Sequence, residues 1–341
     1  MNINFNLHNK ELQKFHGNIN RRNVIGYEKY LDGLRGLAIA LVFATHANFL
    51  TSIGYLGVDI FFVVSGFVIA KQLSTLSNIS FRKFFIKRFS RLAPAMYLVI
   101  VVALIFKITN IPIMQISLKE AFASLLWVKN FSSWGSGLDF LWSVSAEIQV
   151  YLVFAIIQFW IRHKSRRFQM SLWLGMFVGL QCLMIITYLR TSAESFNQDG
   201  FVYLTIGRPS AFFLGVALTL YSGIHISLIV RAAALLTIPL VILIPIPTTV
   251  ALFTASIIIY CQHYRIVRSK LEGKYLVSVG VLSYSIYLWH ILTIEIMRHL
   301  ISNKAIQLIA SIGVVLSLAS ASYLFFELPI RSRIQKLAGR L

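Results

Sequence analysis

Long apolar runs are the feature that most constrains the fold of this chain. An apolar run of about 20 residues is the length that an α-helix needs to cross a lipid bilayer. With 57% hydrophobic and 13% charged residues, the 341-residue chain does not resemble a soluble, disordered or disulfide-rich secreted protein. The sequence predicts an all-α polytopic membrane protein with about ten transmembrane helices. The predicted spans lie at roughly 34–51, 54–73, 92–109, 141–161, 168–189, 203–222, 227–246, 248–264, 275–297 and 305–326.

The distribution of basic residues indicates how the chain lies in the membrane. The 32 Lys and Arg residues exceed the 12 Asp and Glu residues, and basic residues of membrane proteins collect in cytoplasmic loops. With a cytoplasmic N-terminus, 25 of the 32 basic residues fall on the cytoplasmic side, provided that the segment 116–129 does not cross. We therefore expect both termini in the cytoplasm and a short interfacial or re-entrant helix at 116–129.

We expect a single membrane domain at 31–330, preceded by a cytoplasmic tail at 1–30 and followed by a basic cytoplasmic tail at 331–341. No cleavable signal peptide is expected, because the first apolar run starts only after about 30 polar residues. The two cysteines, Cys182 and Cys261, both lie in apolar runs. Neither a disulfide framework nor a metal site is expected.

Ionisable side chains inside the predicted spans are candidates for function, because burying one costs several kcal/mol unless it is paired or hydrated. Five such side chains fall in the outer half of the predicted bundle, so they could face one another across a cavity. The alternative is a structural role, with an ion pair between Asp59 and Arg208 as the simplest case. The five residues are His46, Asp59, Glu147, Arg208 and His290.

The first span carries Arg35 at its cytoplasmic mouth and His46 eleven residues further on. Along a helix this spacing corresponds to about 16 Å. A histidine is well suited to take a proton from a hydroxyl near neutral pH, which makes His46 a candidate general base. The alternative interpretation is an interfacial arginine together with a buried histidine that a neighbouring hydroxyl satisfies.

A basic cluster precedes the third span. It contains Arg82, Lys83, Lys87, Arg88 and Arg91. Arg88 and Arg91 are three residues apart and share a helix face, and guanidinium groups match phosphate well. The cluster predicts a site for a phosphorylated cytosolic ligand, or else an anchor for membrane lipid headgroups. Binding of nucleic acid is not expected, because the other basic residues are dispersed over separate loops.

Seven segments between Leu31 and Pro329 resemble, in this order, the membrane-bound acyltransferase-3 family. Members of this family include O-acetylases of bacterial O-antigen and other surface polysaccharides. The segments are Leu31–Leu37 with the spacing from Arg35 to His46, Gly57–Gly66, Arg88–Pro94, Trp142–Tyr151, Gly207–Gly215, Ser283–His290 and Glu327–Pro329.

This resemblance implies transfer of an acetyl or other acyl group from cytosolic acetyl-CoA or another acyl-CoA to a hydroxyl of a surface glycan. The implied setting is lipopolysaccharide O-antigen biosynthesis in a bacterial inner membrane, with no metal. By position, His46 resembles the essential histidine, Arg35 its paired arginine, Arg88 and Arg91 the cytoplasmic arginine motif, and Glu147 the fourth-span carboxylate. Ile148 follows Glu147 where members often have an acidic or aromatic residue, so only one carboxylate is available there.

The resemblance and the predicted depths together suggest a division of roles. Arg88 and Arg91, with Arg35 and Arg82, would hold the CoA phosphates, and His46 would deprotonate the acceptor hydroxyl. Glu147 would orient the imidazole or bind the acceptor. The further candidates for contact with the substrate or the oxyanion are Asp59, Arg208 and His290. Direct transfer and an acyl-His46 intermediate both remain open.

Two other functions fit parts of the sequence. Ten spans with charged groups in the membrane also describe a transporter of a small anion or sugar. An acyltransferase could instead act on a small molecule or a lipid-linked oligosaccharide. Some family members add an esterase-like domain after the membrane unit, and because this sequence stops at Leu341, the unit is expected to act alone or with a separate partner.

Overall fold

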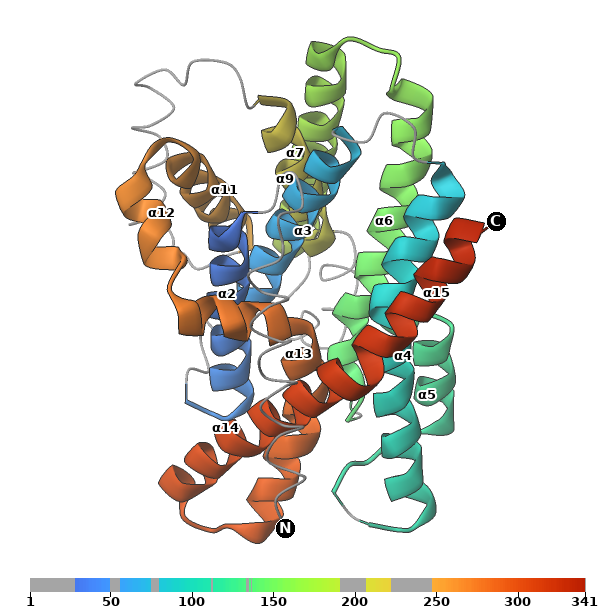
Figure 1. Cartoon of the computed structure of the whole chain (residues 1–341), viewed down its shortest axis with the longest axis vertical. Helices are drawn as coiled ribbons and strands as arrows, with labels where there is room; N and C mark the ends of the chain where they lie inside the picture. Colours follow the sequence, from blue (N-terminus) through green and yellow to red (C-terminus); the bar gives the residue numbers. More distant parts are fainter. Residues whose placement is uncertain are drawn as a thin grey trace.

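The computed structural model describes residues 28–49, 56–74, 80–111, 113–132, 135, 137–190, 207–221 and 247–340, and in these residues all regular secondary structure is helical (Figure 1). The α-helices are α2 (Lys29–His46), α3 (Gly57–Ser74), α4 (Phe81–Ile108), α5 (Leu118–Leu125), α6 (Trp142–Ile161), α7 (Arg166–Arg190), α9 (Ala211–Tyr221), α11 (Pro247–His263), α12 (Arg265–Leu271), α13 (Lys274–Leu300), α14 (Lys304–Ala321) and α15 (Leu328–Arg340). The short turns are η2 (Lys129–Phe131), η3 (Asp139–Leu141), η4 (Arg208–Ser210) and the π-helical η5 (Ser322–Glu327).

Within the described ranges, five helices are long and apolar enough to cross a membrane, and the bent pair of α11 and α12 would make a sixth span. The bend between α11 and α12 is 116°. The sequence prediction of an all-helical chain with several membrane-length helices is thereby confirmed. The predicted span at 227–246 lies outside the described residues, and of the predicted span at 203–222 the structure describes η4 and α9.

The segment 116–129 contains the short helix that the sequence predicts. Helix α5 has 8 residues, so it is about 12 Å long and cannot cross a bilayer. It begins with a capping box, in which the Ser117 side chain accepts from the Glu120 N–H and the Glu120 carboxylate accepts from the Ser117 N–H. Buried Lys129 then pairs with Glu120 (3.4 Å) and Asp139 (2.9 Å), which joins α5 to η3, the turn directly before α6.

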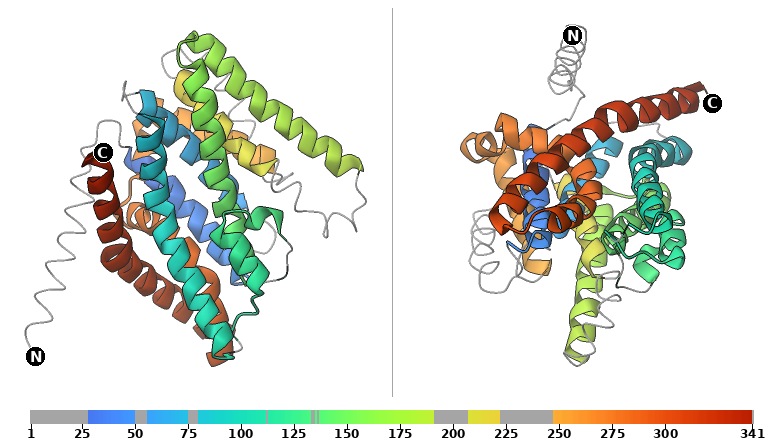
Figure 2. Two further views of the ribbon diagram at one scale, coloured as in Figure 1. Left: turned by 90° about the vertical axis from the view of Figure 1, so that its right-hand side faces the viewer. Right: turned by 90° about the horizontal axis from the view of Figure 1, so that it is seen from below.

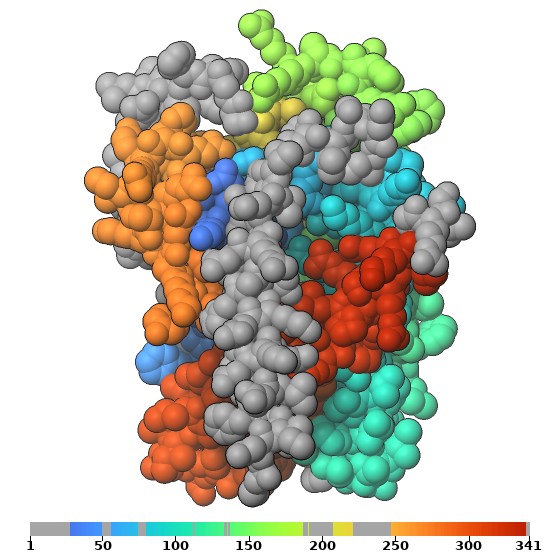
Figure 3. Space-filling view, viewed as in Figure 1, coloured from blue at the N-terminus to red at the C-terminus, as the bar shows by residue number. Residues whose placement is uncertain are grey.

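The basic segment predicted as a tail at 331–341 is helical through Arg340. Helix α14 continues through η5 into α15, which packs against α4, as the red and teal segments show in Figures 1 and 3. Gln335 on α15 donates a hydrogen bond to Ser90 on α4 (3.4 Å). In both views of Figure 2, α14 and α15 lie on one side of the bundle and α7 lies on the opposite side. The C-terminal residues are therefore part of the bundle.

Helix α2 packs against α13 and α3, and α3 packs in turn against α9. Each of these three contacts brings backbones together at glycines. A Cβ placed on Gly280 of α13 would lie 1.7 Å from the backbone oxygen of Asp32 on α2, and one on Gly66 of α3 would lie 1.9 Å from that of Phe212 on α9. Small residues permit this close helix packing in membranes. The contact at Gly280 fixes which side chains of α2 and α13 face each other.

We predict that Gly280→Ala lowers the free energy of unfolding by at least ~2 kcal/mol, because the added methyl group has no space between the two backbones. The measurement is thermal unfolding of the purified protein in detergent. Gly313→Ala on α14 is the matched control, because a Cβ there meets no atom within 4 Å. Equal stability of the two variants would show that α2 and α13 are not in direct backbone contact.

Candidate active site

Two cavities adjoin each other inside the bundle. The larger, which we call the basic cavity, has a volume of about 260 Å³ and lies between α2, α3, α4, α13, η5 and α15. The smaller, which we call the central cavity, has a volume of about 50 Å³ and lies between α2, α3, α4, α6 and α13. Arg35, Arg91 and Tyr284 line both cavities, so these three side chains form the boundary between them.

Cationic side chains outnumber carboxylates in the basic cavity. Asp32 pairs with Arg35 (3.0 Å) and Glu28 pairs with Lys71 (2.8 Å). The third carboxylate, Glu327, accepts hydrogen bonds from two serine hydroxyls. The excess of positive charge suits an anionic ligand. The six cationic side chains of the lining are Arg35, Lys71, Lys87, Arg88, Arg91 and Arg331.

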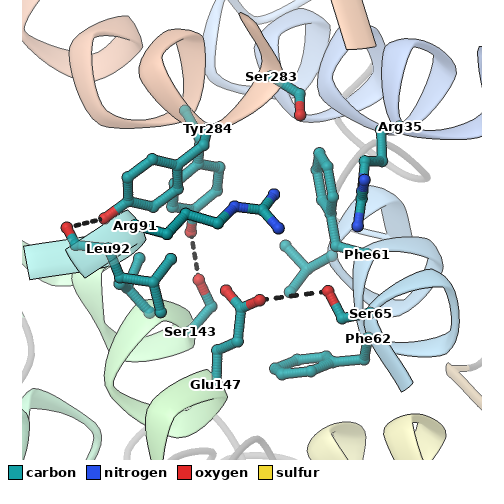
Figure 4. Close-up of a pocket in the computed structure, with 13 residues that line it drawn as sticks. Arg35, Phe61, Phe62, Ser65, Arg91, Leu92, Ser143, Glu147, Ser283 and Tyr284 are labelled. Atoms are coloured by element: carbon teal, nitrogen blue, oxygen red, sulfur yellow. Dashed lines mark hydrogen bonds between the residues drawn. The ribbon is translucent and has the colours of Figure 1, made fainter. Parts of the chain in front are cut away.

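The two arginines of the motif Arg88-x-x-Arg91 differ in their surroundings. Arg88 is buried, donates to Gln72 (2.5 Å) and lies over the ring of Phe84, while its Nε has no hydrogen-bond partner. Arg91 forms no hydrogen bond or ion pair with another described residue, and its guanidinium points into the central cavity (Figure 4). A buried donor without a partner is costly, so both arginines retain hydrogen-bonding capacity for a ligand.

The central cavity has one carboxylate. Glu147 on α6 accepts hydrogen bonds from Ser65 (3.2 Å) and from the Tyr151 hydroxyl, and its carboxylate lies across the cavity from Arg91 (Figure 4). Hydroxyl groups line the opposite wall, where Tyr284 donates to the Leu92 carbonyl (2.6 Å). The rest of the lining is largely apolar and comes from Val58, Phe61, Phe62, Leu92 and Val144.

Two histidines lie beyond the central cavity, at the end of α2 and on the adjacent part of α13. The rings of His46 and His290 meet edge to face, with centroids 4.8 Å apart. In each ring Nδ1 is hydrogen bonded to a carbonyl of the same helix, that of Val42 (2.8 Å) for His46 and that of Tyr287 for His290. A carbonyl can only accept, so Nδ1 carries the proton and Nε2 of the neutral ring is available as a base.

The pair of histidines, His46 and His290, is linked both to the central cavity and to the end of α13. The Tyr287 ring lies 5.3 Å from that of His290 and also lines the central cavity. The buried Nε2 of His290 has no hydrogen-bond partner. At the C-terminal end of α13, Arg298 donates to the backbone oxygen of His46 (2.7 Å) and so joins the end of α2 to α13.

The expected ion pair between Asp59 and Arg208 is present. The guanidinium donates to both carboxylate oxygens, at 3.0 Å and 2.7 Å, and both side chains are buried. Arg208 also lies over the ring of Trp142 (5.7 Å). The ion pair thus joins η4 to α3, and the contact of Arg208 with Trp142 joins η4 to the start of α6.

The five ionisable residues that the sequence places at one depth do not share a single cavity. Only Glu147 lines one of the two cavities, while His46 contacts His290 and Asp59 pairs with Arg208. The rotation of each helix about its axis decides which neighbour a side chain meets, and predicted depth does not contain that information. The Val42 carbonyl, rather than Glu147, orients the His46 imidazole.

Among the arginines predicted to bind phosphate, Arg35, Arg88 and Arg91 line the basic cavity, whereas Arg82 lies on the exposed first turn of α4 and lines neither cavity. The sequence analysis did not single out Asp32, although its spacing of three from Arg35 places both on one helix face. The other charged lining residues that it did not single out are Lys71 and Arg331. Lys87 belongs to the predicted basic cluster, and Glu327 lies in the last of the seven family segments without a predicted role.

Comparison with known proteins assigns the class to which this fold and site belong. The family model described as "Acyltransferase domain" matches residues 28–326, which include the whole lining of the central cavity, most of the lining of the basic cavity and the histidine pair. The chain therefore belongs to the acyltransferase-3 family.

Two bacterial O-acetyltransferases resemble the chain over most of its length. It is 30% identical to the peptidoglycan O-acetyltransferase OatA of Listeria monocytogenes, with 89% of this chain and 56% of the relative covered. It is 27% identical to the O-acetyltransferase OatA of Staphylococcus aureus, with 89% and 57% covered. The chain thus spans little more than half the length of these relatives. No solved structure matches it significantly.

We predict that Asp59→Asn lowers the free energy of unfolding by about 3–5 kcal/mol, because Arg208 would remain charged and buried without its partner. Chemical unfolding of the purified protein in detergent measures this change. The double variant Asp59→Leu/Arg208→Met should be more stable than Asp59→Asn, since it removes both charges. A single variant as stable as the wild type would contradict a buried ion pair.

Proposed function

We propose that this protein is an integral membrane O-acyltransferase that moves an acetyl group from a cytosolic acyl-CoA to a hydroxyl of a surface glycan. The observation that carries the proposal is the order of features along α2 and α13. A basic cavity, a central cavity and a pair of histidines with available Nε2 atoms follow one another across the bundle. This order matches a phosphorylated donor at one end and deprotonation of an acceptor at the other.

The proposed topology places the basic cavity at the cytoplasmic face of a bacterial inner membrane. Lys71, Lys87, Arg88 and Arg331 lie at this end of the bundle, as basic residues on the cytoplasmic side do. With this orientation we propose the ten spans and the two cytoplasmic termini that the sequence predicts. The histidine pair then lies toward the outer face.

In the donor site, Arg88, Lys87 and Arg331 would bind the phosphates of CoA, with no metal required. The pantetheine arm would pass between Arg35 and Arg91 into the central cavity, since both residues line both cavities. Arginine suits this role because its planar guanidinium presents several donors to phosphate oxygens at once.

In the proposed reaction, Nε2 of His46 takes the proton of the acceptor hydroxyl. The hydroxyl oxygen attacks the thioester carbon, the C–S bond breaks, and the departing CoA sulfur receives the proton from His46. Arg208 is committed to Asp59, and Nε2 of neutral His290 can only accept, so neither is a ready donor to the oxyanion. Direct transfer and transfer through an acyl-His46 intermediate both fit this arrangement.

The acceptor that we propose is a hydroxyl of a cell-surface glycan. The relatives are named as O-acetyltransferases, and the one from Listeria as acting on peptidoglycan. O-antigen and a lipid-linked glycan carry the same type of hydroxyl. Mass spectrometry of each glycan from strains with and without the gene identifies the acceptor by the loss of one acetyl unit.

We predict that His46→Ala abolishes O-acetylation at wild-type protein levels, because it removes the base. The measurement is ester-linked acetate on the glycans of the complemented strain. His299→Ala is the matched control, since its Nδ1 also bonds to a carbonyl of its own helix, that of Glu295 (2.9 Å), but the residue is exposed at the end of α13. Undiminished acetylation in His46→Ala would contradict the catalytic role.

We predict that Arg91→Ala raises KM for acetyl-CoA by about tenfold or more, the effect of losing a charge-assisted hydrogen bond. Transfer of radiolabelled acetyl from acetyl-CoA to glycan in membrane vesicles gives the rates. Arg82→Ala is the control on the same helix, and its KM should change less than about twofold because the side chain is solvated. An equal effect of the two substitutions would place the donor outside the basic cavity, and a wild-type protein that transfers no label would favour a carrier.

A further inference from the structure

The central cavity is small compared with the basic cavity that leads to it. Its volume is about 50 Å³, against about 260 Å³ for the basic cavity. A cavity needs a volume of roughly 10–15 Å³ to hold one buried water molecule, so the central cavity accommodates about three to five non-hydrogen atoms. An acetyl group has three non-hydrogen atoms and fits this space, whereas longer acyl chains soon exceed it.

The lining of the central cavity matches an acyl group in its chemistry. Its walls include the apolar side chains of Phe61, Phe62 and Leu92, which suit an alkyl chain. Arg91 points its guanidinium into the same space and has no protein partner among the described residues. A guanidinium can donate a hydrogen bond to the carbonyl oxygen of a thioester and stabilise the negative charge that develops there.

The end of the central cavity furthest from the basic cavity lies at Val58 and Val144. Val68 of α3 lines the basic cavity and Val58 lines the central cavity, ten residues earlier on the same helix, a distance of about 15 Å. Val144 lies in the first turn of α6 and is buried. At this end the Ser143 hydroxyl is hydrogen bonded to that of Tyr287 (2.7 Å), which also donates to the Phe140 carbonyl (2.7 Å).

We infer that the central cavity is the subsite for the acyl group of the donor and that Val58 and Val144 limit this group to about two carbons. The inference rests on the proposed function, because it takes an acyl-CoA as the donor. A chain longer by two methylene groups would press against closely packed side chains. One extra methylene in a closed apolar pocket changes affinity by about tenfold or more.

The test measures dissociation constants of CoA, acetyl-CoA and butyryl-CoA for the full chain, purified in lipid nanodiscs, by calorimetry. This measurement requires no acceptor. We expect the wild type to bind acetyl-CoA at least about tenfold more tightly than butyryl-CoA, and Val144→Ala to bring the two constants within about twofold of each other. Val58→Ala is the second variant, and it should also reduce the difference between the dissociation constants of acetyl-CoA and butyryl-CoA.

Val150→Ala is the matched control, because Val150 is buried on the same helix but lines neither cavity, and it should keep the wild-type ratio. Equal affinity of the wild type for acetyl-CoA and butyryl-CoA would overturn the inference. A ratio that neither Val144→Ala nor Val58→Ala changes, or that Val150→Ala changes equally, would overturn it too. A wild-type protein that binds no CoA would instead overturn the proposed donor, and the inference with it.

Discussion

The direct backbone contact between α2 and α13 at Gly280 is the constraint on which the site depends. Arg35 and His46 come from α2, and Tyr284 and His290 come from α13. With no side chain between the two backbones, sliding or separation of the helices is opposed by the packing itself. This helix pair therefore sets the contact of the two imidazoles and the positions of Arg35 and Tyr284 at the boundary between the two cavities, which Arg91 of α4 completes.

Pairing separates structural from functional ionisable groups in this apolar bundle. Asp59 with Arg208, and Lys129 with Glu120 and Asp139, satisfy one another and join neighbouring elements. By contrast, Arg91 and Nε2 of His290 have no hydrogen-bond partner among the described residues. Arg91 and His290 therefore keep hydrogen-bonding capacity that no described residue uses.

The sequence predicted the helical class, the short helix at α5 and the ion pair of Asp59 with Arg208, because apolar length and the cost of buried charge are local or pairwise properties. The sequence did not show that Arg88 lines the basic cavity while Arg82 does not. The two arginines are six positions apart on one helix and differ only in the neighbours that tertiary packing supplies. The place of Arg331 in the basic cavity depends on α15 folding back onto α4, a contact between segments about 240 residues apart. Cavity size is likewise a property of packing that no single segment encodes.

The hydrogen bond from Arg298 to the backbone of His46 has a mechanical consequence. It joins the last turn of α2 to the C-terminal end of α13, while each imidazole is held by a carbonyl of its own helix. The two rings thus belong to one rigid body. Movement of the surrounding helices would therefore leave the spacing of the two rings unchanged.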